Sequence, residues 1–551
     1  MDNEDSEIDL SKSNSEYKKF ATNAFFSFLV NYGSHFFTLV YSFLTARLIS
    51  DESWDFLFIA TSYITIIAVI INFLPPGLEH ALNYYIPRYL TLNQKSNIKS
   101  LIKNAFLIKL IFLIPILIIS LIGFLFFTNI FSVNLENKIS LLYLLFPLII
   151  TISSKYILDA INRGFSKFNF LIILLLVKNA IHIIPLLIYY ILDIPISVEI
   201  IALIVMISSV IPFIISLLYI LIKIAKIPPE NNDKKSFKED TSITFKFGNY
   251  IGISDLIDKM WRETQIQGIS IFASEGAVTG YNIGLKYRNI SLFSVTSFRF
   301  PLLTSFSSLN TKERHDQISK MYKITSKVTL FILLIISGVL FFTVDFFLDF
   351  FFTEDRLIYS NFLRLLVIAT TFRILGYFVQ TLLNAQYKVK ISLLLNILSV
   401  SYTIPLFFLG LIYFGVEMAI FFGFILGNII SLIIQIFFSK KYGNVELNKK
   451  KIIIQYITFF VPFGITLILE RLIFKEASLS FIQALGLSLF KNFDFYSVGT
   501  FLILFILMNL LLKTVTRKDI NNFETLLNEK RFIDRILIKL LNVLKKVTRK
   551  Q

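Results

Sequence analysis

The chain has 551 residues, of which 55% are apolar, and its mean hydropathy is +0.70. Soluble globular chains are about 45–50% apolar, and the excess here falls in blocks of roughly 20 residues, the length of helix that crosses about 30 Å of hydrocarbon. The net charge of +17 comes from residues between these blocks, a pattern that indicates membrane topology and argues against nucleic-acid binding. The absence of cysteine excludes disulfides, thiolate metal sites and cysteine nucleophiles.

The chain begins with an acidic segment, residues 1–19, which lacks the basic region and early apolar core of a cleaved signal peptide. We expect a cytoplasmic tail here, followed by a first apolar helix that acts as the signal anchor. The hydropathy predicts an all-α polytopic membrane protein with about 14 transmembrane helices. The predicted helices are 20–48, 56–87, 104–127, 139–161, 168–192, 196–222, 247–273, 277–306, 328–350, 357–385, 391–414, 417–438, 452–470 and 495–513.

The loops between these helices test the predicted topology through their lysine and arginine content. The six loops assigned to the cytoplasm hold 24 of these residues, and the seven loops assigned to the other side hold six. This bias is the one that the positive-inside rule describes. We therefore expect a multi-pass protein of the cell (cytoplasmic) membrane with both termini in the cytoplasm.

The chain also repeats itself after about 220 residues, because segments 157–185 and 379–405 are similar and their landmarks keep their order. The matched pairs are Asn162 with Asn384, Pro185 with Pro405, Glu199 with Glu417, and Glu52 with Glu275, at offsets of 222, 220, 218 and 223 residues. Two six-helix copies share one orientation because six is even. The sequence thus predicts two pseudo-symmetric six-helix lobes related by an axis along the membrane normal. Chance similarity between Leu- and Ile-rich segments is the alternative.

The duplication divides the chain into predicted parts. They are an N-terminal lobe (20–226), a cytoplasmic linker (227–243), a C-terminal lobe (244–441) and two additional transmembrane helices (451–515). Residues 516–551 place apolar side chains at helical spacing among lysines and arginines. This pattern predicts a basic amphipathic cytoplasmic helix at the inner leaflet, and a partner-binding helix is the alternative.

The first predicted helix carries a polar stripe at steps of three or four residues. Its members are Ser27, Asn31, His35, Thr38, Ser42 and Thr45. In lipid such a stripe must face protein or a water-filled cavity. Hydrogen bonding between helices would explain it. The position of His35 in its middle favours a stripe that faces a lumen.

The helix at 247–273 is the most charged of the predicted membrane segments. Asp255, Asp258, Lys259, Arg262 and Glu263 place five ionisable groups within nine residues. A charge at membrane depth costs at least about 2.5 kcal/mol, so such groups pair with one another or face a cavity. Local ion pairs would make the helix insertable, but the number of charges favours a substrate or ion pathway.

Three further helices add polar groups to the predicted cavity. In the helix at 56–87, Pro75, Pro76 and Gly77 precede Glu79 and His80, which predicts a bent element that lines a cavity. The other groups are Lys178 with His182 in 168–192, and Lys286, Arg288 and Arg299 in 277–306.

The sequence thus predicts a cavity that is rich in cations and contains a few carboxylates. Lysine and arginine hold phosphate, diphosphate or acidic sugars through charge-assisted hydrogen bonds. The candidate head-group residues are Asn31, His35, Lys178, Lys259, Arg262, Lys286, Arg288 and Arg299. The candidates for a coupling proton or sodium ion are Glu79, Asp255, Asp258 and Glu263. No catalytic residue, metal ligand or bound cofactor is predicted.

Four phrases carry a resemblance to a known family. They are TARLISDESWDFLF (45–58), GLEHALNYYIPRY (77–89), LDAINRGFSKF (158–168) and FASEGAVTGYNIG (272–284). With the layout of helices over residues 18–515, they resemble the polysaccharide and oligosaccharide flippases of the Wzx type. These belong to the superfamily that also contains multidrug extruders and lipid II flippases. The first helix departs from the multidrug branch, because it lacks the acidic residue that is common there.

The resemblance implies two six-helix lobes around a central cavity, with alternating access by rocking of the lobes. It implies a substrate that is a polyprenyl- or dolichyl-(di)phosphate-linked oligosaccharide, whose lipid tail would follow a groove formed by the two additional helices. The expected partners are this substrate, membrane lipids and glycan-assembly enzymes, without nucleic acid. A proton or sodium gradient is the expected source of coupling.

Two other functions stay open. An ion-coupled multidrug or toxin extruder is the first, and the predicted cationic cavity argues against it. A membrane glycosyltransferase or polysaccharide polymerase is the second, and Asp51, Glu52 and Asp55 would be its early acidic loop residues. The short outer loops and the duplication favour a transporter. ATP-driven transport lacks support because no phosphate-binding GxxxxGK[ST] loop occurs.

Overall fold

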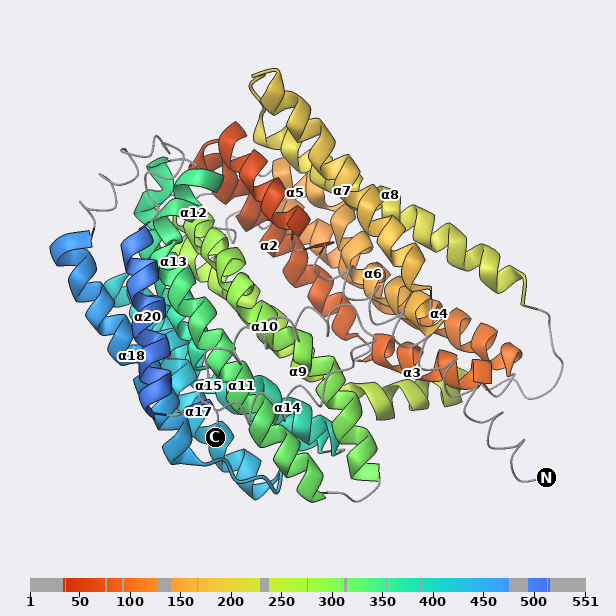
Figure 1. Cartoon of the computed structure of the whole chain (residues 1–551). Helices are drawn as coiled ribbons and strands as arrows, with labels where there is room; N and C mark the ends of the chain where they lie inside the picture. The colour runs from red at the N-terminus through yellow and green to blue at the C-terminus, as the bar shows by residue number, and fades with distance from the viewer. Residues whose placement is uncertain are drawn as a thin grey trace, which may run out of the picture. The chain divides into compact units, whose positions relative to one another are not determined.

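The regular elements of the protein are helices throughout the part that the computed structural model describes (Figure 1). This part comprises residues 33–74 apart from His35, 77–91, 94–126, 140–165, 167–227, 237–274, 276–311, 315–352, 354–386, 388–474, 494–512 and 514–515. Within it, 10 helices are long and apolar enough to cross a membrane, or up to 11 if a bent pair counts as one span. The chain is therefore an all-α, multi-pass membrane protein, and the total of 14 helices stays a prediction.

The chain divides into two compact units between Gln267 and Gly268. This boundary lies inside the helix α9 (Phe237–Phe272), so that helix contributes residues to both units. Of the predicted linker at 227–243, residues 228–236 lie outside the described residues, and residues 237–243 belong to the helix α9. The acidic tail and the C-terminal amphipathic helix, residues 1–19 and 516–551, lie outside them entirely.

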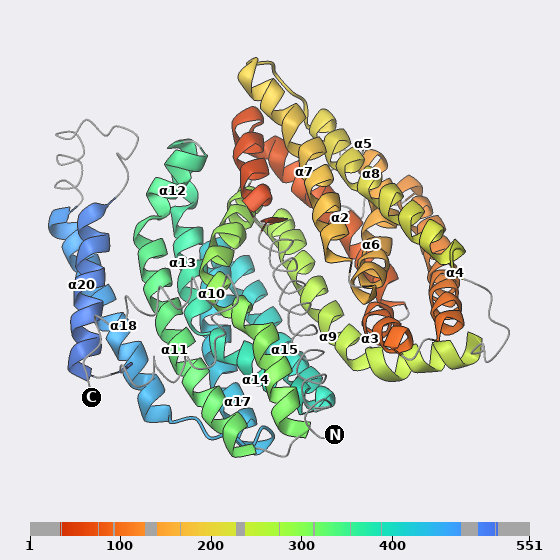
Figure 2. The same cartoon turned by 45° about the vertical axis from the view of Figure 1, so that its right-hand side comes forward.

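The first unit is built around α6, which packs against every other helix from α2 to α8 in this unit. A shorter apolar helix, Phe36–Leu48, precedes them. The helices are α2 (Asp51–Phe73), α3 (Leu78–Thr91), α4 (Lys95–Phe126), α5 (Ser140–Leu145), α6 (Pro147–Gly164), α7 (Phe168–Ile191) and α8 (Val198–Ala225). α7 and α8 lie side by side in both views (Figures 1 and 2). Gly164 lets α6 approach α3, because a Cβ there would come within 2.8 Å of Ile86 Cβ.

The predicted helix at 56–87 is two helices, α2 and α3, with a break between Phe73 and Leu78. Gly77 has a φ of 73°, a left-handed conformation that glycine adopts without steric cost. The sequence correctly predicted a bent element at this point. It did not predict that α2 would begin as early as Asp51, where Ser50 caps it by accepting a hydrogen bond from the Ser53 N–H group.

The second unit contains more helix interruptions than the sequence predicted. Its elements are α10 (Ala277–Thr311), α11 (His315–Phe342), α12 (Val344–Phe351), η3 (Glu354–Tyr359), α13 (Ser360–Thr371), α14 (Ile374–Ala385), α15 (Val389–Phe414), α16 (Val416–Ile420), the π-helical η4 (Phe421–Leu426), α17 (Gly427–Lys441), α18 (Lys449–Leu469), the π-helical η5 (Glu470–Phe474) and α20 (Phe495–Leu512). The predicted helix at 357–385 is bent by 44° between α13 and α14. The predicted helix at 328–350 begins earlier, at His315, and breaks at Thr343.

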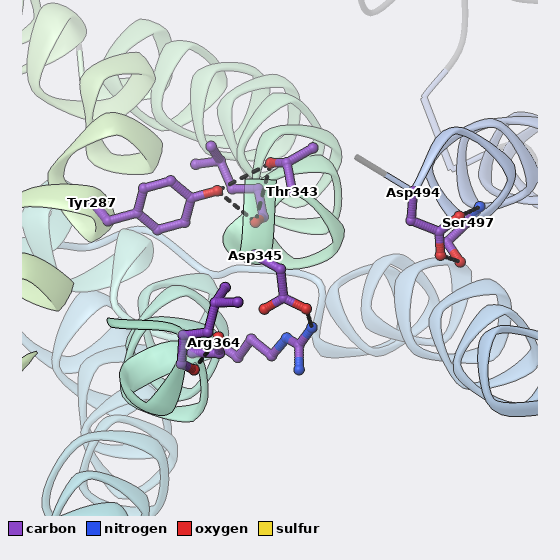
Figure 3. Close-up of polar contacts among 9 residues, drawn as sticks. Tyr287, Thr343, Asp345, Arg364, Asp494 and Ser497 are labelled. Carbon is purple, nitrogen blue, oxygen red and sulfur yellow. Dashed lines mark hydrogen bonds and ion pairs between the residues drawn. The ribbon is translucent and has the colours of Figure 1, made fainter. Parts of the chain in front are cut away.

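Polar contacts between helices surround this break at Thr343 (Figure 3). The Tyr287 hydroxyl donates to the Leu340 carbonyl at 2.7 Å and lies 3.0 Å from the Thr343 hydroxyl. Nearby, the Arg364 guanidinium pairs with the Asp345 carboxylate at 3.0 Å. The charge of Arg364 is therefore balanced by a carboxylate from the neighbouring helix α12.

The same chain reversal occurs once in each unit and supports the duplication. The Lys167 N–H group donates to the Asn162 carbonyl at 2.8 Å between α6 and α7, and the Lys388 N–H group donates to the Leu383 carbonyl at 2.8 Å between α14 and α15. These turns are related by an offset of 221 residues. Asn162 therefore corresponds to Leu383 in the structure, one position from the Asn384 that sequence matching paired with it.

The two additional helices, α18 and α20, pack against each other and against α11 (Figure 2). Their contact is aromatic, since the Phe501 ring of α20 lies among Phe459, Phe342 and Phe505. Phe501 is fully buried. A Cβ on Gly338 of α11 would lie 2.0 Å from this ring, so α20 approaches α11 only because residue 338 has no side chain.

We predict that Gly338→Ala weakens the attachment of α20 to α11. The new methyl group has no space beside the enclosed Phe501 ring, and overpacking of this kind costs about 1–3 kcal/mol. The measurement is the thermal unfolding midpoint of the purified protein in detergent.

The matched control is Gly464→Ala on α18, where a Cβ would meet no atom within 4 Å. This change should leave the midpoint unchanged or raise it slightly, because alanine favours helix over glycine. Equal midpoints for the two variants would contradict the close packing of α11 and α20.

Candidate functional site

The first unit contains a cavity of about 720 Å³ that is lined by charged and polar side chains. Its walls come from Ser34 and from the helices α3, α6, α7, α8 and α9. The polar residues among its lining are Ser34, Glu79, Asn83, Thr151, Lys155, Tyr156, Asp159, Arg163, Lys178, Ser209, Ser216, Asp255, Asp258 and Lys259. A volume of this size is in the range of small-molecule binding sites.

The central helix α6 supplies the longest polar wall of this cavity. Thr151, Lys155, Asp159 and Arg163 follow one another at intervals of four residues, and all four line the cavity. This spacing places them on one face of an α-helix. The opposite faces of α6 are apolar and pack into the unit, so the polar stripe is held towards the cavity.

The charges that line the cavity are balanced, with four cations and four carboxylates. Asp159 of α6 interacts electrostatically with Lys155, Arg163 and Lys178, so one carboxylate lies among three cations from two helices. Lys178 in turn interacts with both Lys155 and Asp159. A cation-rich cavity with a few carboxylates, among them Glu79, Asp255 and Asp258, was predicted. The structure places these three in the cavity and adds Asp159 of α6, so that the lining of the first unit has as many carboxylates as cations.

The α9 side of the cavity is tied to α6 by a cation–π contact. The Lys259 ammonium lies 4.0 Å from the centre of the Tyr156 ring. Such a contact stabilises by about 0.5–2 kcal/mol, with the larger values in desolvated places. It holds Lys259 at the cavity wall, beside Asp255 and Asp258 one turn or less away along α9.

A much smaller cavity of about 30 Å³ adjoins this site and shares four of its lining residues, Glu79, Tyr156, Asp255 and Lys259. It also reaches Lys109 of α4, which is 4% exposed. The Lys109 ammonium donates hydrogen bonds to the Ile71 carbonyl and to the Asn72 Oδ1 atom, each at 2.8 Å. The Lys109 side chain thus donates to the carbonyl end of α2 at the break before α3, where carbonyl groups have no partner within the helix.

The cavity brings five of the predicted site residues together. They are Glu79, Lys178, Asp255, Asp258 and Lys259. Two others on α9, Arg262 and Glu263, do not line the cavity. Arg262 is exposed, and Glu263 is buried elsewhere in the unit. His182, which was predicted to join the cavity with Lys178, packs instead against Tyr41, with 4.0 Å between the centres of the two rings.

Two further predicted site residues, Lys286 and Arg288, do not line this cavity. Lys286 and Arg288 lie on α10 in the second unit, where the Arg288 guanidinium is 5.8 Å from the Phe424 ring centre. The side chains of Asn31, His35 and Arg299 lie outside the described residues. Their role as head-group residues stays a prediction.

The sequence interpretation missed Lys109 and the polar stripe of α6. The signal for the stripe was present, since Thr151, Lys155 and Asp159 recur every four residues within the apolar segment at 139–161. This signal was overlooked because one lysine and one aspartate four residues apart in an apolar segment can also be explained as a local ion pair within the helix. The tertiary contacts of Lys109 with α2 left no sequence signal.

The arrangement can hold a ligand that carries both an anionic group and hydroxyl groups. Ammonium and guanidinium groups donate charge-assisted hydrogen bonds to phosphate oxygens, and carboxylates accept hydrogen bonds from hydroxyls. The serine, threonine and asparagine side chains of the wall add neutral donors and acceptors.

Comparisons with known proteins agree with this architecture. The family model described as polysaccharide biosynthesis protein matches residues 20–307. A search of curated proteins found no match. Among solved structures, the lipid II flippase MurJ in an inward closed conformation is similar at 16% identity and a TM-score of 0.63, over 89% of this chain and 98% of that one.

Multidrug transporters of the MATE family are also similar in fold. An inward-facing MATE transporter of the MOP superfamily has 13% identity and a TM-score of 0.59, over 75% of this chain and 94% of that one. The Vibrio cholerae MATE transporter VcmN has 16% identity and a TM-score of 0.54, over 77% of this chain and 98% of that one. The chain therefore belongs to the polysaccharide biosynthesis protein family and has the fold of the flippases and transporters of the MOP superfamily.

Proposed function

We propose that the protein translocates a polyprenyl- or dolichyl-(di)phosphate-linked oligosaccharide across the cell membrane by alternating access. The observation that carries this proposal is the cavity of the first unit, in which Lys155, Arg163, Lys178 and Lys259 are placed beside carboxylates in an otherwise apolar bundle. Charges at membrane depth are retained where they face a water-filled pathway or a ligand.

The cations suit the phosphate end of such a substrate. Lys155, Arg163 and Lys178 all interact electrostatically with Asp159, and all four residues line the cavity. A phosphate that enters the cavity would add negative charge among these donors. Donors that the fold holds in place bind an anion more tightly than flexible ones.

The carboxylates suit the sugar end or a coupling ion. Asp255, Asp258 and Glu79 are candidates to accept hydrogen bonds from sugar hydroxyls, or to bind a proton or sodium ion from a gradient. Their place in the same cavity as the cations would let the arrival of an ion change the affinity for the anionic head group.

The likeness to MurJ supports a lipid-linked substrate. It covers 89% of this chain, whereas the MATE transporters cover 75% and 77%. The additional helices α18 and α20, which pack as a pair on α11, are available to guide a lipid tail. Glycan-assembly enzymes of the same membrane are the proposed partners.

An ion-coupled extruder of cationic compounds is the second candidate. Two findings favour it, namely the four carboxylates of the cavity and the fold shared with MATE transporters. The three cations around Asp159 weigh against it, because a cationic substrate would meet repulsion there.

We predict that the double variant Lys155→Gln with Lys178→Gln slows translocation of a lipid-linked oligosaccharide by at least about 100-fold. Two charge-assisted hydrogen bonds to the head group would be lost, each of about 1.5–3 kcal/mol when fully formed. The measurement is the rate at which the substrate becomes accessible on the far leaflet of proteoliposomes.

The control is Lys103→Gln, which removes an exposed lysine of α4 away from the cavity. It should translocate at the wild-type rate. Unchanged translocation in the double variant would contradict the assignment of the cavity. Absence of translocation by the wild type, together with gradient-driven uptake of a cationic dye, would establish the extruder instead.

We also predict that Asp255→Asn with Asp258→Asn abolishes acceleration by an imposed proton or sodium gradient. A potential of 100 mV is worth about 2.3 kcal/mol per charge moved, which is roughly a 50-fold effect on the transport equilibrium. Translocation without a gradient should persist in this variant. Glu52→Gln, at an exposed position on α2, should retain the gradient response. A full response in the Asp255 and Asp258 variant would refute coupling through α9.

Because the chain has no cysteine, single cysteines can report on the cavity. We predict that a negatively charged thiol reagent modifies Ser209→Cys, in the cavity wall, at least about tenfold faster than Leu218→Cys. Leu218 lies on the exposed apolar surface of the same helix, which would face lipid and so exclude a charged reagent. Lipid-linked oligosaccharide should slow only the modification of Ser209→Cys. Equal rates, or no protection by the substrate, would count against a water-filled binding cavity.

A further inference from the structure

A second large cavity lies in the second unit, between the beginnings of α11 and α18, and has a volume of about 780 Å³. It has no lining residue in common with the cavity of the first unit. Its charged lining residues are Lys323, Lys327, Glu446, Lys449, Lys450 and Lys451. Five ammonium groups from two helices thus face one carboxylate in this lining.

The single carboxylate, Glu446, is already paired with a lysine that does not line the cavity. The Lys440 ammonium donates to Glu446 Oε1 at 2.7 Å, and this contact holds the pKa of Glu446 below its ordinary value. Glu446 is therefore charged at neutral pH and bound to a sixth lysine. Lys323 and Lys449 also interact with it electrostatically, but the lining keeps a strong positive excess.

The N-terminus of α18 opens into the same cavity. Asn448 caps the helix by accepting a hydrogen bond from the Lys451 N–H group at 3.1 Å. The N–H groups of the first helical residues, Lys449 and Lys450, have no partner within the helix. Helix N-termini with such donors attract anions, and lysine side chains beside them strengthen the attraction.

Buried polar side chains form the floor of this cavity. Ser326 is 3% exposed, and its hydroxyl makes no hydrogen bond to the described residues. Gln455, also 3% exposed, donates from Nε2 to the Lys327 carbonyl at 2.9 Å and ties α18 to α11. Buried polar side chains of α11 and α18 thus contribute to the cavity, which is therefore more than a cluster of lysines on an exposed loop.

An apolar surface continues from the lysines along α18. Ile453, Ile457, Val461, Ile465 and Ile468 are all exposed, and they recur at three or four residues, on one face of the helix. Lys449 and Lys450 precede Ile453 by one helical turn on that face. A molecule with an anionic head and hydrocarbon chains would therefore meet cations at the helix start and an apolar stripe beyond it.

We infer that this cavity binds the phosphate of an anionic lipid head group, with the acyl chains along the exposed face of α18. The site is separate from the proposed transport cavity, and the lipid would act as a bound structural or regulatory ligand. A soluble phosphate compound has the same head-group chemistry but would leave the apolar stripe unused.

The experiment is native mass spectrometry of the purified full-length chain in detergent. It would be titrated separately with phosphatidylglycerol, phosphatidylcholine and inorganic pyrophosphate. We expect phosphatidylglycerol to bind more tightly than phosphatidylcholine. We expect Lys323→Gln with Lys449→Gln to weaken its binding by at least about tenfold, since each lysine near an anionic lipid surface contributes roughly fivefold.

The matched control is Lys390→Gln with Lys441→Gln. It removes two exposed lysines that do not line the cavity. Both lie at the same end of the unit as the cavity, where the Lys388 ammonium of α15 donates a hydrogen bond to the Tyr442 carbonyl after α17. Lipid binding should be unchanged in it. An equal loss in the control would overturn the site in favour of a general charge effect.

Two further outcomes would overturn the inference. Pyrophosphate binding that depends on Lys323 and Lys449, without such dependence for phosphatidylglycerol, would assign the cavity to a soluble phosphate. A loss of lipid binding in Lys155→Gln with Lys178→Gln instead would assign the lipid to the transport cavity. Thermal unfolding of each variant separates loss of lipid binding from loss of folding. Translocation by the variant Lys323→Gln with Lys449→Gln is measured separately, so that failure of the lipid site and failure of the proposed transport function can be distinguished.

Discussion

The low dielectric of the membrane is the constraint on which the organisation of this protein depends. An ionisable side chain in that environment must be neutralised by a partner, bonded to backbone carbonyls or placed against water. Each solution occurs here, in the Arg364 and Asp345 pair, in the Lys109 cap on α2, and in the charged wall of the first cavity. The helices that carry charge are consequently the ones whose faces are fixed in rotation, and a helix without charged residues, such as α20, packs against them.

Hydropathy and charge bias were sufficient to predict the all-helical membrane fold and the approximate place of most helices. The length of each apolar segment and the lysine and arginine content of each loop can be read from neighbouring residues alone. Predicting the helices from them therefore requires no knowledge of tertiary contacts. The interruptions at Thr343 and between α13 and α14 could not be predicted in the same way. They lack a proline or glycine at the break itself, and the Leu340 carbonyl near Thr343 is satisfied by Tyr287, which is distant in sequence.

The site was predicted best where several charges lie close together on one helix. Asp255, Asp258 and Lys259 were identified because their density in an apolar segment is unusual, and they do line the cavity. Arg262 and Glu263 belong to the same cluster but lie elsewhere, because residues that are adjacent along a helix point in different directions. Lys155 and Asp159 were missed because their significance depends on Lys178, which approaches them only after α6 and α7 have folded together.

The matching turns between α6 and α7 and between α14 and α15 bear on how the two units differ. Each turn has one backbone hydrogen bond of 2.8 Å at the corresponding position, although the side chains beside it differ. At corresponding points the first unit has Asn162, Arg163 and Gly164, and the second has Leu383, Asn384 and Ala385. The same turn is therefore compatible with different polar content, with Arg163 at the cavity in one unit and the uncharged Asn384 at the corresponding position in the other.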